Sequence, residues 1–270
     1  MKLKKIKLPE FKKLNSFLSN RFGEILLTLI LILVSLLSFK EGFFLLSNDN
    51  YSPELNPTLS VQRYIESPAW RSYRVLGFAS ESEQADVFRS GIFAGLETFL
   101  PNWSIGQIFA LISLCVGTLS MAYLTTIFIR DFVSTKYSRY IFLISGVMYL
   151  TTLWTAWVFN FNMMPYITQF GFLPLLLLSV YLLMKDWSWA KVLLLSIASI
   201  LFSSSSVIAT LFFVNIFLIT GAFIYWGYLH KTKIRKILIG IGIFILLQLF
   251  WFLPFIQYTF SSTQNIIDSY

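Results

Sequence analysis

Apolar runs long enough to cross a membrane recur along the chain and are separated by polar connections. The first run begins at Ile25 and continues past Phe39 and Lys40-Glu41 to Leu46. At about 1.5 Å of rise per helical residue, such a run spans the roughly 30 Å of hydrocarbon in a bilayer. The later runs are Ile105 to Ile129, Tyr140 to Phe159, Ile167 to Met184, Val192 to Phe202, Val207 to Leu229 and Ile237 to Gln257. The pattern predicts an all-α polytopic membrane protein with about seven transmembrane helices.

Four consecutive serines, 203–206, separate the fifth and sixth runs. A single helix from Val192 to Leu229 would place the basic stretch His230 to Lys236 on the outer side, so we predict an outward-facing turn at the serines. The fifth run is then only half a span long. It fits a re-entrant or broken helix that lines a cavity, or a span that ends in an ordinary tight turn. Both interpretations stay open.

A long polar loop, residues 47–103, joins the first two runs and interrupts the pattern. A short helix is predicted from Thr58 to Tyr64, ending before Ser67-Pro68. A second helix is predicted after the capping box Ser80-Glu81-Ser82-Glu83. Its apolar stripe at helical spacing is Ala85, Phe88, Ile92, Leu96 and Phe99, with Asp86, Arg89 and Glu97 pointing away. The stripe fits a helix on the bilayer surface and a helix packed on the other spans equally well.

The distribution of basic residues orients the chain. With the N-terminus inside, the inner segments hold the seven basic residues of the N-terminus and Arg130, Lys136, Arg139, Lys185, Lys191, Lys231, Lys233, Arg235 and Lys236. Seven carboxylates outnumber the four arginines of the outer loop, so the net charge of +8 indicates topology rather than nucleic-acid binding. We therefore expect a protein of the cell membrane with a basic cytoplasmic N-terminus (1–23), a transmembrane domain (24–257) and an outer C-terminal stub (258–270).

Candidate chemistry concentrates in the outer loop. Asp49 and Glu54 follow the first span closely and place two carboxylates at the membrane edge, in a stretch ordered by Pro53 and Pro57. A second cluster lies near the outer ends of spans three and four: Trp154, Trp157, Asn160, Asn162, Tyr166 and Gln169. Its aromatic and amide groups suit a sugar or a lipid phosphate, and an interfacial aromatic belt explains the aromatics equally well.

Several kinds of chemistry are excluded. The chain has no P-loop, dinucleotide fingerprint or nucleophile elbow, so we expect no nucleotide-powered transport by this chain alone. One histidine and one cysteine, Cys115, exclude a protein-rich zinc site and an intramolecular disulfide. No metal ligand is assigned, but Mg²⁺ or Mn²⁺ held by Asp49 and Glu54 stays an alternative.

The stretch Asp49-Asn50-Tyr51-Ser52-Pro53-Glu54-Leu55-Asn56-Pro57, followed by Trp70, Gly77 and Leu100-Pro101-Asn102-Trp103, resembles the GT-C superfamily of membrane glycosyltransferases, most closely the α-(1→3)-arabinofuranosyltransferase type. A second patch with this likeness is Asn162-Met163-Met164-Pro165-Tyr166 followed by Phe172-Leu173-Pro174-Leu175-Leu176. The chain departs from the family in two ways, since GT-C enzymes commonly have more spans and this type carries large additional outer domains. The resemblance therefore also fits the N-terminal part of a longer protein.

The resemblance implies an inverting transfer of a sugar, for this type a pentose, from a polyprenyl-phosphate donor to a cell-envelope glycan or glycolipid on the outer face. Asp49 would be the general base, with Glu54 as the alternative. The residues that would bind the substrate or stabilise the leaving phosphate are Arg63, Trp70, Arg71, Arg74, Arg89, Asn162 and Tyr166. For Arg89, a surface ion pair with Asp86 is the structural alternative.

Two other functional classes fit the sequence. A transporter or lipid flippase would place ionisable residues inside the spans, where the clearest candidates are Lys40 and Glu41 near the outer end of the first span. A non-catalytic scaffold of envelope polysaccharide assembly would tolerate replacement of Asp49. No cofactor follows from any of the three.

Overall fold

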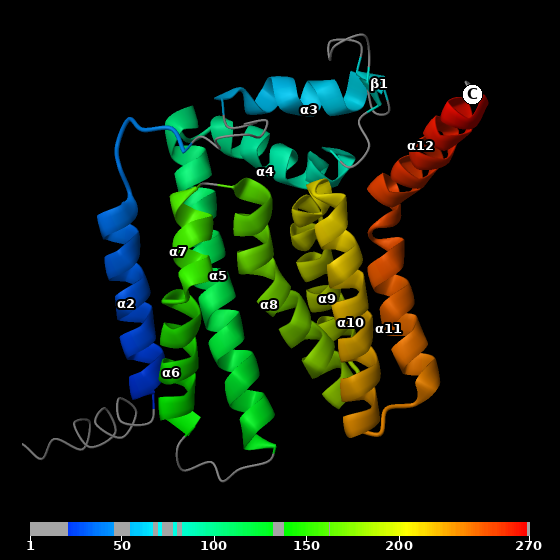
Figure 1. The fold of residues 1–270 in the computed structure, drawn as a ribbon. Coiled ribbons are helices and arrows are strands. Elements are labelled where there is room, and N and C mark those ends of the chain that lie inside the picture. Colours follow the sequence, from blue (N-terminus) through cyan, green and yellow to red (C-terminus); the bar gives the residue numbers. More distant parts are fainter. Residues whose placement is uncertain are drawn as a thin grey trace, which may run out of the picture.

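The computed structural model describes residues 21–45, 55–66, 70–71, 78–79, 83–131, 138–161 and 163–268. The regular structure of this part is helical apart from one antiparallel pair of two-residue strands, so the predicted all-α fold is confirmed. The bundle consists of α2 (Phe22–Ser38), α5 (Asn102–Arg130), α6 (Ser138–Leu150), α7 (Leu153–Asn160), α8 (Met164–Lys185), α9 (Trp189–Phe202), α10 (Ala209–Leu229), α11 (Ile234–Leu246) and α12 (Leu249–Asp268). Figure 1 shows the loop between α2 and α5 lying across one end of this bundle, here called the loop end.

The helices of a multi-pass membrane protein are present. Four segments are long and apolar enough to cross a bilayer: Asn102–Arg130, Met164–Lys185, Trp189–Val207 and Thr210–Leu229. Two bent pairs, α6 with α7 and α11 with α12, raise the number to six if each pair is one span. The apolar helix α2 has 17 residues. The part of the chain that the structure describes therefore holds four to six candidate spans, and the count of seven stays a prediction.

The fifth run is longer than the sequence predicts. α9 begins at Trp189 rather than Val192, and the serines continue it as the 3₁₀ helix η4 (Ser203–Val207). The combined segment has 19 residues, so the expected half-length span is wrong. The break lies where the serines predict it, because α10 starts again at Ala209. All four serines are at most 2% exposed, so the turn is packed inside the protein.

The centre of the bundle is the contact between α5 and α8. In the span of α8, 72% of the residues are buried, against 28% for α10. Glycines allow the close approach: a Cβ added at Gly117 would lie 2.4 Å from the Phe170 carbonyl oxygen, and one at Gly171 would lie 2.7 Å from the Ser113 Cβ. Close backbone packing through small residues is a principal source of helix association in membranes.

The loop packs on the bundle through the helices α3 (Pro57–Glu66) and α4 (Val87–Glu97) and the 3₁₀ helix η2 (Glu83–Asp86). Figure 1 shows α3 and α4 lying across the bundle axis. Ser203 of η4 donates a hydrogen bond from its Oγ to the Ala85 carbonyl oxygen at 3.0 Å. The Glu97 carboxylate accepts hydrogen bonds from Thr58 at 2.7 Å and Asn102 at 3.0 Å, so it joins α3, α4 and α5. The hydrogen bond from Thr58 lowers the pKa of Glu97 below its usual value.

The side of α4 that carries Arg89 is buried, whereas part of the predicted apolar stripe is exposed. Phe88 and Ile92 of the predicted stripe are each 41% exposed, whereas Asp86 is 3% and Arg89 5% exposed. Both nitrogens that Arg89 directs at Asp86 lie 2.7 Å from the carboxylate oxygens. This two-point pairing removes much of the cost of burying the charges, which is why a charged face can turn inward. The pair predicted from spacing exists, but it is buried and not on the surface.

A charged cluster closes the opposite end of the bundle. Asp131, just after α5, accepts hydrogen bonds from Tyr181 and, at 2.7 Å, from the Lys185 ammonium, both on α8. The His230 ring, at the end of α10, lies edge to face against the Tyr181 ring with centroids 5.2 Å apart. Its Nε2 is buried and makes no hydrogen bond within the described ranges. Three helices therefore meet at one partly buried histidine.

Protonation of His230 should destabilise the protein. Burial lowers the pKa of His230 below its usual value, although the Asp131 carboxylate opposes this shift. A lowered folded-state pKa means that the stability is complete above the usual value of about 6.5 and is lost as the pH falls through the folded-state value. Because His230 is the only histidine, we expect the melting temperature in detergent to fall between about pH 7 and pH 5, and to fall less in His230→Gln. Equal slopes for both proteins would contradict this assignment.

Candidate functional site

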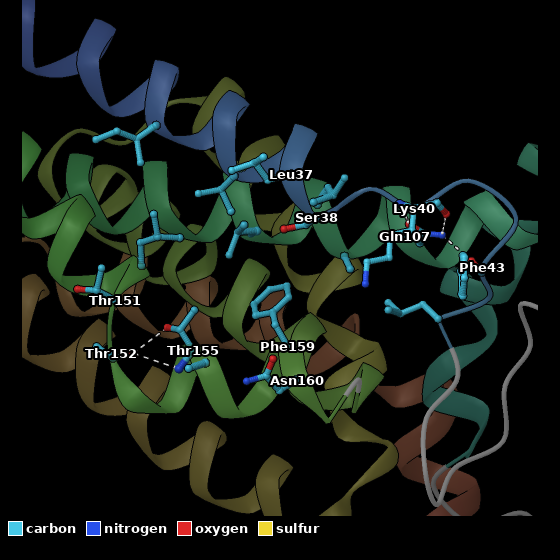
Figure 2. Close-up of a pocket in the computed structure, with 18 of the residues that line it drawn as sticks. Leu37, Ser38, Lys40, Phe43, Gln107, Thr151, Thr152, Thr155, Phe159 and Asn160 are labelled. Atoms are coloured by element: carbon cyan, nitrogen blue, oxygen red, sulfur yellow. Dashed lines mark hydrogen bonds between the residues drawn. The ribbon is translucent and has the colours of Figure 1, made fainter.

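A cavity of about 930 Å³ lies between α2, α5 and the bend between α6 and α7. Figure 2 shows that its wall also includes the segment after α2. Its apolar wall includes Ile30, Val34 and Leu37 of α2, Ala110, Leu111 and Leu114 of α5, and Phe159 of α7. The polar residues of its wall are Ser38, Lys40, Gln107, Thr151, Thr152, Thr155 and Asn160. Its size and its largely apolar wall are typical of sites for small or chain-like ligands.

The buried residues of α2 all lie toward its start, away from the loop end. Leu27 and Leu31 are buried in a cluster with α5, α6 and α8, and a Cβ at Gly146 would lie 2.4 Å from a Leu27 methyl group. Toward the loop end, Leu36 and Leu37 are 71% and 74% exposed. Leu37 also lines the cavity, so the cavity reaches the outside along this end of α2.

The bend in the third predicted span forms the floor of the cavity. α6 and α7 meet at 47°, and Thr152 caps α7 by accepting a hydrogen bond from the Thr155 amide. Thr155 in turn donates its hydroxyl to the Tyr149 carbonyl oxygen at 2.7 Å. These bonds satisfy backbone groups that a break inside a membrane would otherwise leave unpaired. The bend is therefore a stable feature that exposes threonines to the cavity.

Gln107 of α5 fixes the segment that leaves α2. Its Oε1 accepts a hydrogen bond from the Lys40 amide at 2.8 Å, and its Nε2 donates to the Lys40 carbonyl oxygen at 2.8 Å and to the Phe43 carbonyl oxygen. Lys40 lines the cavity next to this contact (Figure 2). No carboxylate within the described ranges pairs with the Lys40 ammonium. The rim of the cavity thus carries one cation held by a rigid backbone.

Both residues proposed as the catalytic base and two of those proposed to bind the substrate lie outside the described residues. Asp49, Glu54, Arg74 and Asn162 fall outside the described residues. Trp70 and Arg71 are described only as the strand β1, which pairs with β2 (Phe78–Ala79). Their roles, and the alternative of a divalent cation at Asp49 and Glu54, stay predictions. No cluster of three or more histidine, cysteine or acidic side chains occurs in the ranges that the structure describes.

The remaining candidates do not meet at one site. Arg63 is partly buried on α3, and Arg89 of α4 forms a buried ion pair with Asp86. Neither lines the cavity. Tyr166, at the start of α8, contacts Trp154 and Trp157, whose rings stack with centroids 5.0 Å apart. These tryptophans are 50% and 37% exposed, on the face of α7 away from the residues that line the cavity.

Sequence reasoning identified Lys40 only as an ionisable residue near the end of a span and did not identify Gln107. The sequence does show that Gln107 interrupts the apolar run of α5. It does not show which residues Gln107 binds, because they lie 64 and 67 positions away. Asn160 was predicted to belong with the aromatic cluster, but it lines the cavity.

Comparison with protein-family models, with curated proteins and with solved structures gave no match for this chain.

Proposed function

We propose that this protein is a membrane glycosyltransferase with a GT-C-like fold of seven spans, which moves a sugar, for example a pentose, from a polyprenyl-phosphate donor to an envelope glycan or glycolipid. The observation that supports the proposal is the cavity. Its apolar wall suits the isoprenoid chain, its side is open where lipid would lie, and its polar rim lies beside the loop. A substrate with a long apolar tail and a phosphate head matches this division.

The loop supplies the chemistry in this proposal. Leu45 lines the cavity, and Asp49 follows it by four residues. Four residues of fully extended chain span at most about 14 Å, so Asp49 is within that distance of Leu45. The Asp49 carboxylate takes the proton of an acceptor hydroxyl, whose oxygen then bonds to the anomeric carbon of the sugar. The bond between that carbon and the phosphate oxygen breaks, and the lipid phosphate leaves with the electron pair. Glu54 is the alternative base, and Arg63, Arg71 and Arg74 are candidates to stabilise the leaving phosphate.

The proposed orientation places the loop end outside a cytoplasmic membrane and the N-terminus inside. Basic residues gather at the end of the bundle opposite the loop, at Arg130, Lys185 and the turn between α10 and α11. That turn contains Lys231 and Lys233, and Arg235 and Lys236 follow in the first turn of α11. An excess of lysine and arginine in short loops is typical of the cytoplasmic side.

Loss of the general base should abolish transfer. In membranes that contain equal amounts of folded protein, we expect Asp49→Asn to lower the transfer of labelled sugar from polyprenyl-phosphate donors by about 10²- to 10⁴-fold. Glu41→Gln is the matched control, because it removes a carboxylate eight residues earlier that does not line the cavity. Transfer that survives Asp49→Asn and is lost in Glu54→Gln would move the role to Glu54. Transfer that survives in both would refute a carboxylate base in this loop.

One observation favours a lipid flippase as the second candidate. The break between α6 and α7 exposes Thr151 and Thr152 to the cavity, and broken helices beside a cavity are common in transporters. A flippase would move a fluorescent lipid phosphate across the bilayer of proteoliposomes in the absence of an acceptor, and Asp49→Asn would leave that rate unchanged. A glycosyltransferase would show no such movement.

A further inference from the structure

We propose that Lys40 is the residue that binds the phosphate of a lipid in the cavity, and that Gln107 is a positioning residue that holds Lys40 in place. The inference deepens the proposed function, on which it rests for the identity of the lipid. It transfers phosphate recognition from the arginines of the loop to the end of the first span.

The backbone around Lys40 is fixed by a tight turn. The Phe43 amide donates to the Lys40 carbonyl oxygen at 3.4 Å, which closes a four-residue turn. Gly42, at the third position, has a φ of +77°. A positive φ at this position is the requirement of a type II turn, which glycine meets without strain. The sequence therefore already favours one conformation for the residues beside Lys40.

Gln107 ties this turn to the bundle. Its side-chain amide binds the backbone of Lys40 through both the N–H and the C=O, and it also binds the Phe43 carbonyl oxygen. Gln107 is only 7% exposed, so these bonds form away from water, where losing them is costly. A glutamine amide that satisfies three backbone groups of one turn leaves that turn little freedom to move. Such fixation is how a binding group is preorganised.

The chemistry of the rim selects an anion. Lys40 and Asn160 both line the cavity, and within the described residues neither side chain has a hydrogen-bond partner. An ammonium is a compact donor that binds a phosphate as a point charge. Apart from Ser38, Gln107 and the threonines of the bend, the rest of the wall is apolar. A polyprenyl phosphate has one anionic head on one long apolar chain. The head would bind at Lys40, and the chain would lie against the apolar wall.

The test is direct binding to the purified full chain in detergent, measured by native mass spectrometry with decaprenyl phosphate and with uncharged decaprenol. We expect the wild type to prefer the phosphate. Because a hydrogen bond to a charged group contributes more than a neutral one, Lys40→Met should weaken phosphate binding by about 10- to 100-fold and leave decaprenol binding unchanged. Lys40→Arg should keep most of the preference. Equal binding of both lipids by the wild type, or unchanged phosphate binding by Lys40→Met, would overturn the proposal.

Gln107→Leu tests the positioning role. It should reduce the ratio of phosphate to decaprenol binding toward that of Lys40→Met, whereas a merely structural glutamine would change both lipids together. Gly42→Ala offers a second route, since a Cβ at Gly42 meets nothing within 4 Å and acts only by straining the turn. It should shift the ratio in the same direction. An unchanged ratio in both variants would refute the role of Gln107.

The outcome is separable from that of the proposed function. Binding that depends on Lys40 without any sugar transfer would keep the site and reject the transferase. Transfer that depends on Asp49 while Lys40→Met still binds decaprenyl phosphate normally would keep the transferase and reject this site. Inorganic phosphate serves as a third ligand: if it competes fully at millimolar concentration, the site recognises phosphate without the chain, which also contradicts the proposal.

Discussion

Replacing Arg89 with methionine is expected to lower the free energy of unfolding by about 3–5 kcal/mol, since it breaks a buried two-point ion pair with the Asp86 carboxylate. The two side chains are 5% and 4% exposed, and the arginine also lies over the Phe93 ring at 5.5 Å from its centroid. Methionine keeps much of the volume and removes only the charge. The loss should therefore report the broken ion pair, and it can be measured by denaturant titration in mixed micelles.

A matched control exists in the same chain. Arg21 and Glu24 form an ion pair with the same i, i+3 spacing, but their side chains are 60% and 37% exposed. Arg21→Met should cost about 0–1 kcal/mol, as exposed pairs usually do. Adding Asp86→Leu to Arg89→Met should recover a large part of the loss, because both charges are then gone. Similar costs for the two single variants would show that burial does not govern the Asp86–Arg89 pair.

Replacing Gly171 with leucine is expected to prevent the native contact of α5 and α8. Even a Cβ at this position would lie 2.8 Å from the Ser113 Cα and 2.9 Å from its carbonyl oxygen, and backbone atoms cannot give way as a side chain can. Overpacking a core typically costs about 1–3 kcal/mol, and here a whole side chain must enter the closest helix contact of the bundle. We expect little monodisperse protein after detergent extraction, measured by size-exclusion chromatography.

Gly221→Leu is the control for this substitution. Gly221 also lies inside a span, on α10, but a Cβ there meets nothing within 4 Å. Leucine favours the helix over glycine, so this variant should fold as well as the wild type. If both leucine variants gave normal yields and elution profiles, the α5–α8 contact would not have the central role that its geometry indicates.

The membrane helices could be predicted from the sequence because their signal is local. Apolar runs of span length and the serine break appear in the printed chain, and both are found in the structure. The orientation of α4 could not be predicted in this way. The spacing places Phe88 and Arg89 on opposite faces but leaves open whether the apolar face meets the bilayer or the other spans. In the structure the Asp86–Arg89 pair is buried and Phe88 is partly exposed. A hydrophobicity pattern does not show whether two charged side chains will form an ion pair and so become buried.

The candidate site was harder to predict for a different reason. The bend between α6 and α7 depends on a threonine that caps one helix and on a hydrogen bond from the Thr155 hydroxyl to the Tyr149 carbonyl oxygen, and two threonines are all that marks it in the apolar run. The contact between Gln107 and Lys40 joins residues 67 positions apart. Neither is visible as a motif or a spacing. Lys40 could be identified from the sequence as a charged residue near the end of a span. Its proposed role depends on the contacts of its backbone with Gln107, which only the fold shows.

The half-packed helix α2 also determines how a lipid would be supplied to the protein. A ligand that enters past the exposed end of α2 never leaves the hydrocarbon, so its encounter with the protein is a search in two dimensions. Occupancy then follows the mole fraction of the lipid among its neighbours in the leaflet and not its amount per volume of water. In detergent, adding empty micelles would dilute the lipid and lower occupancy at a constant total concentration.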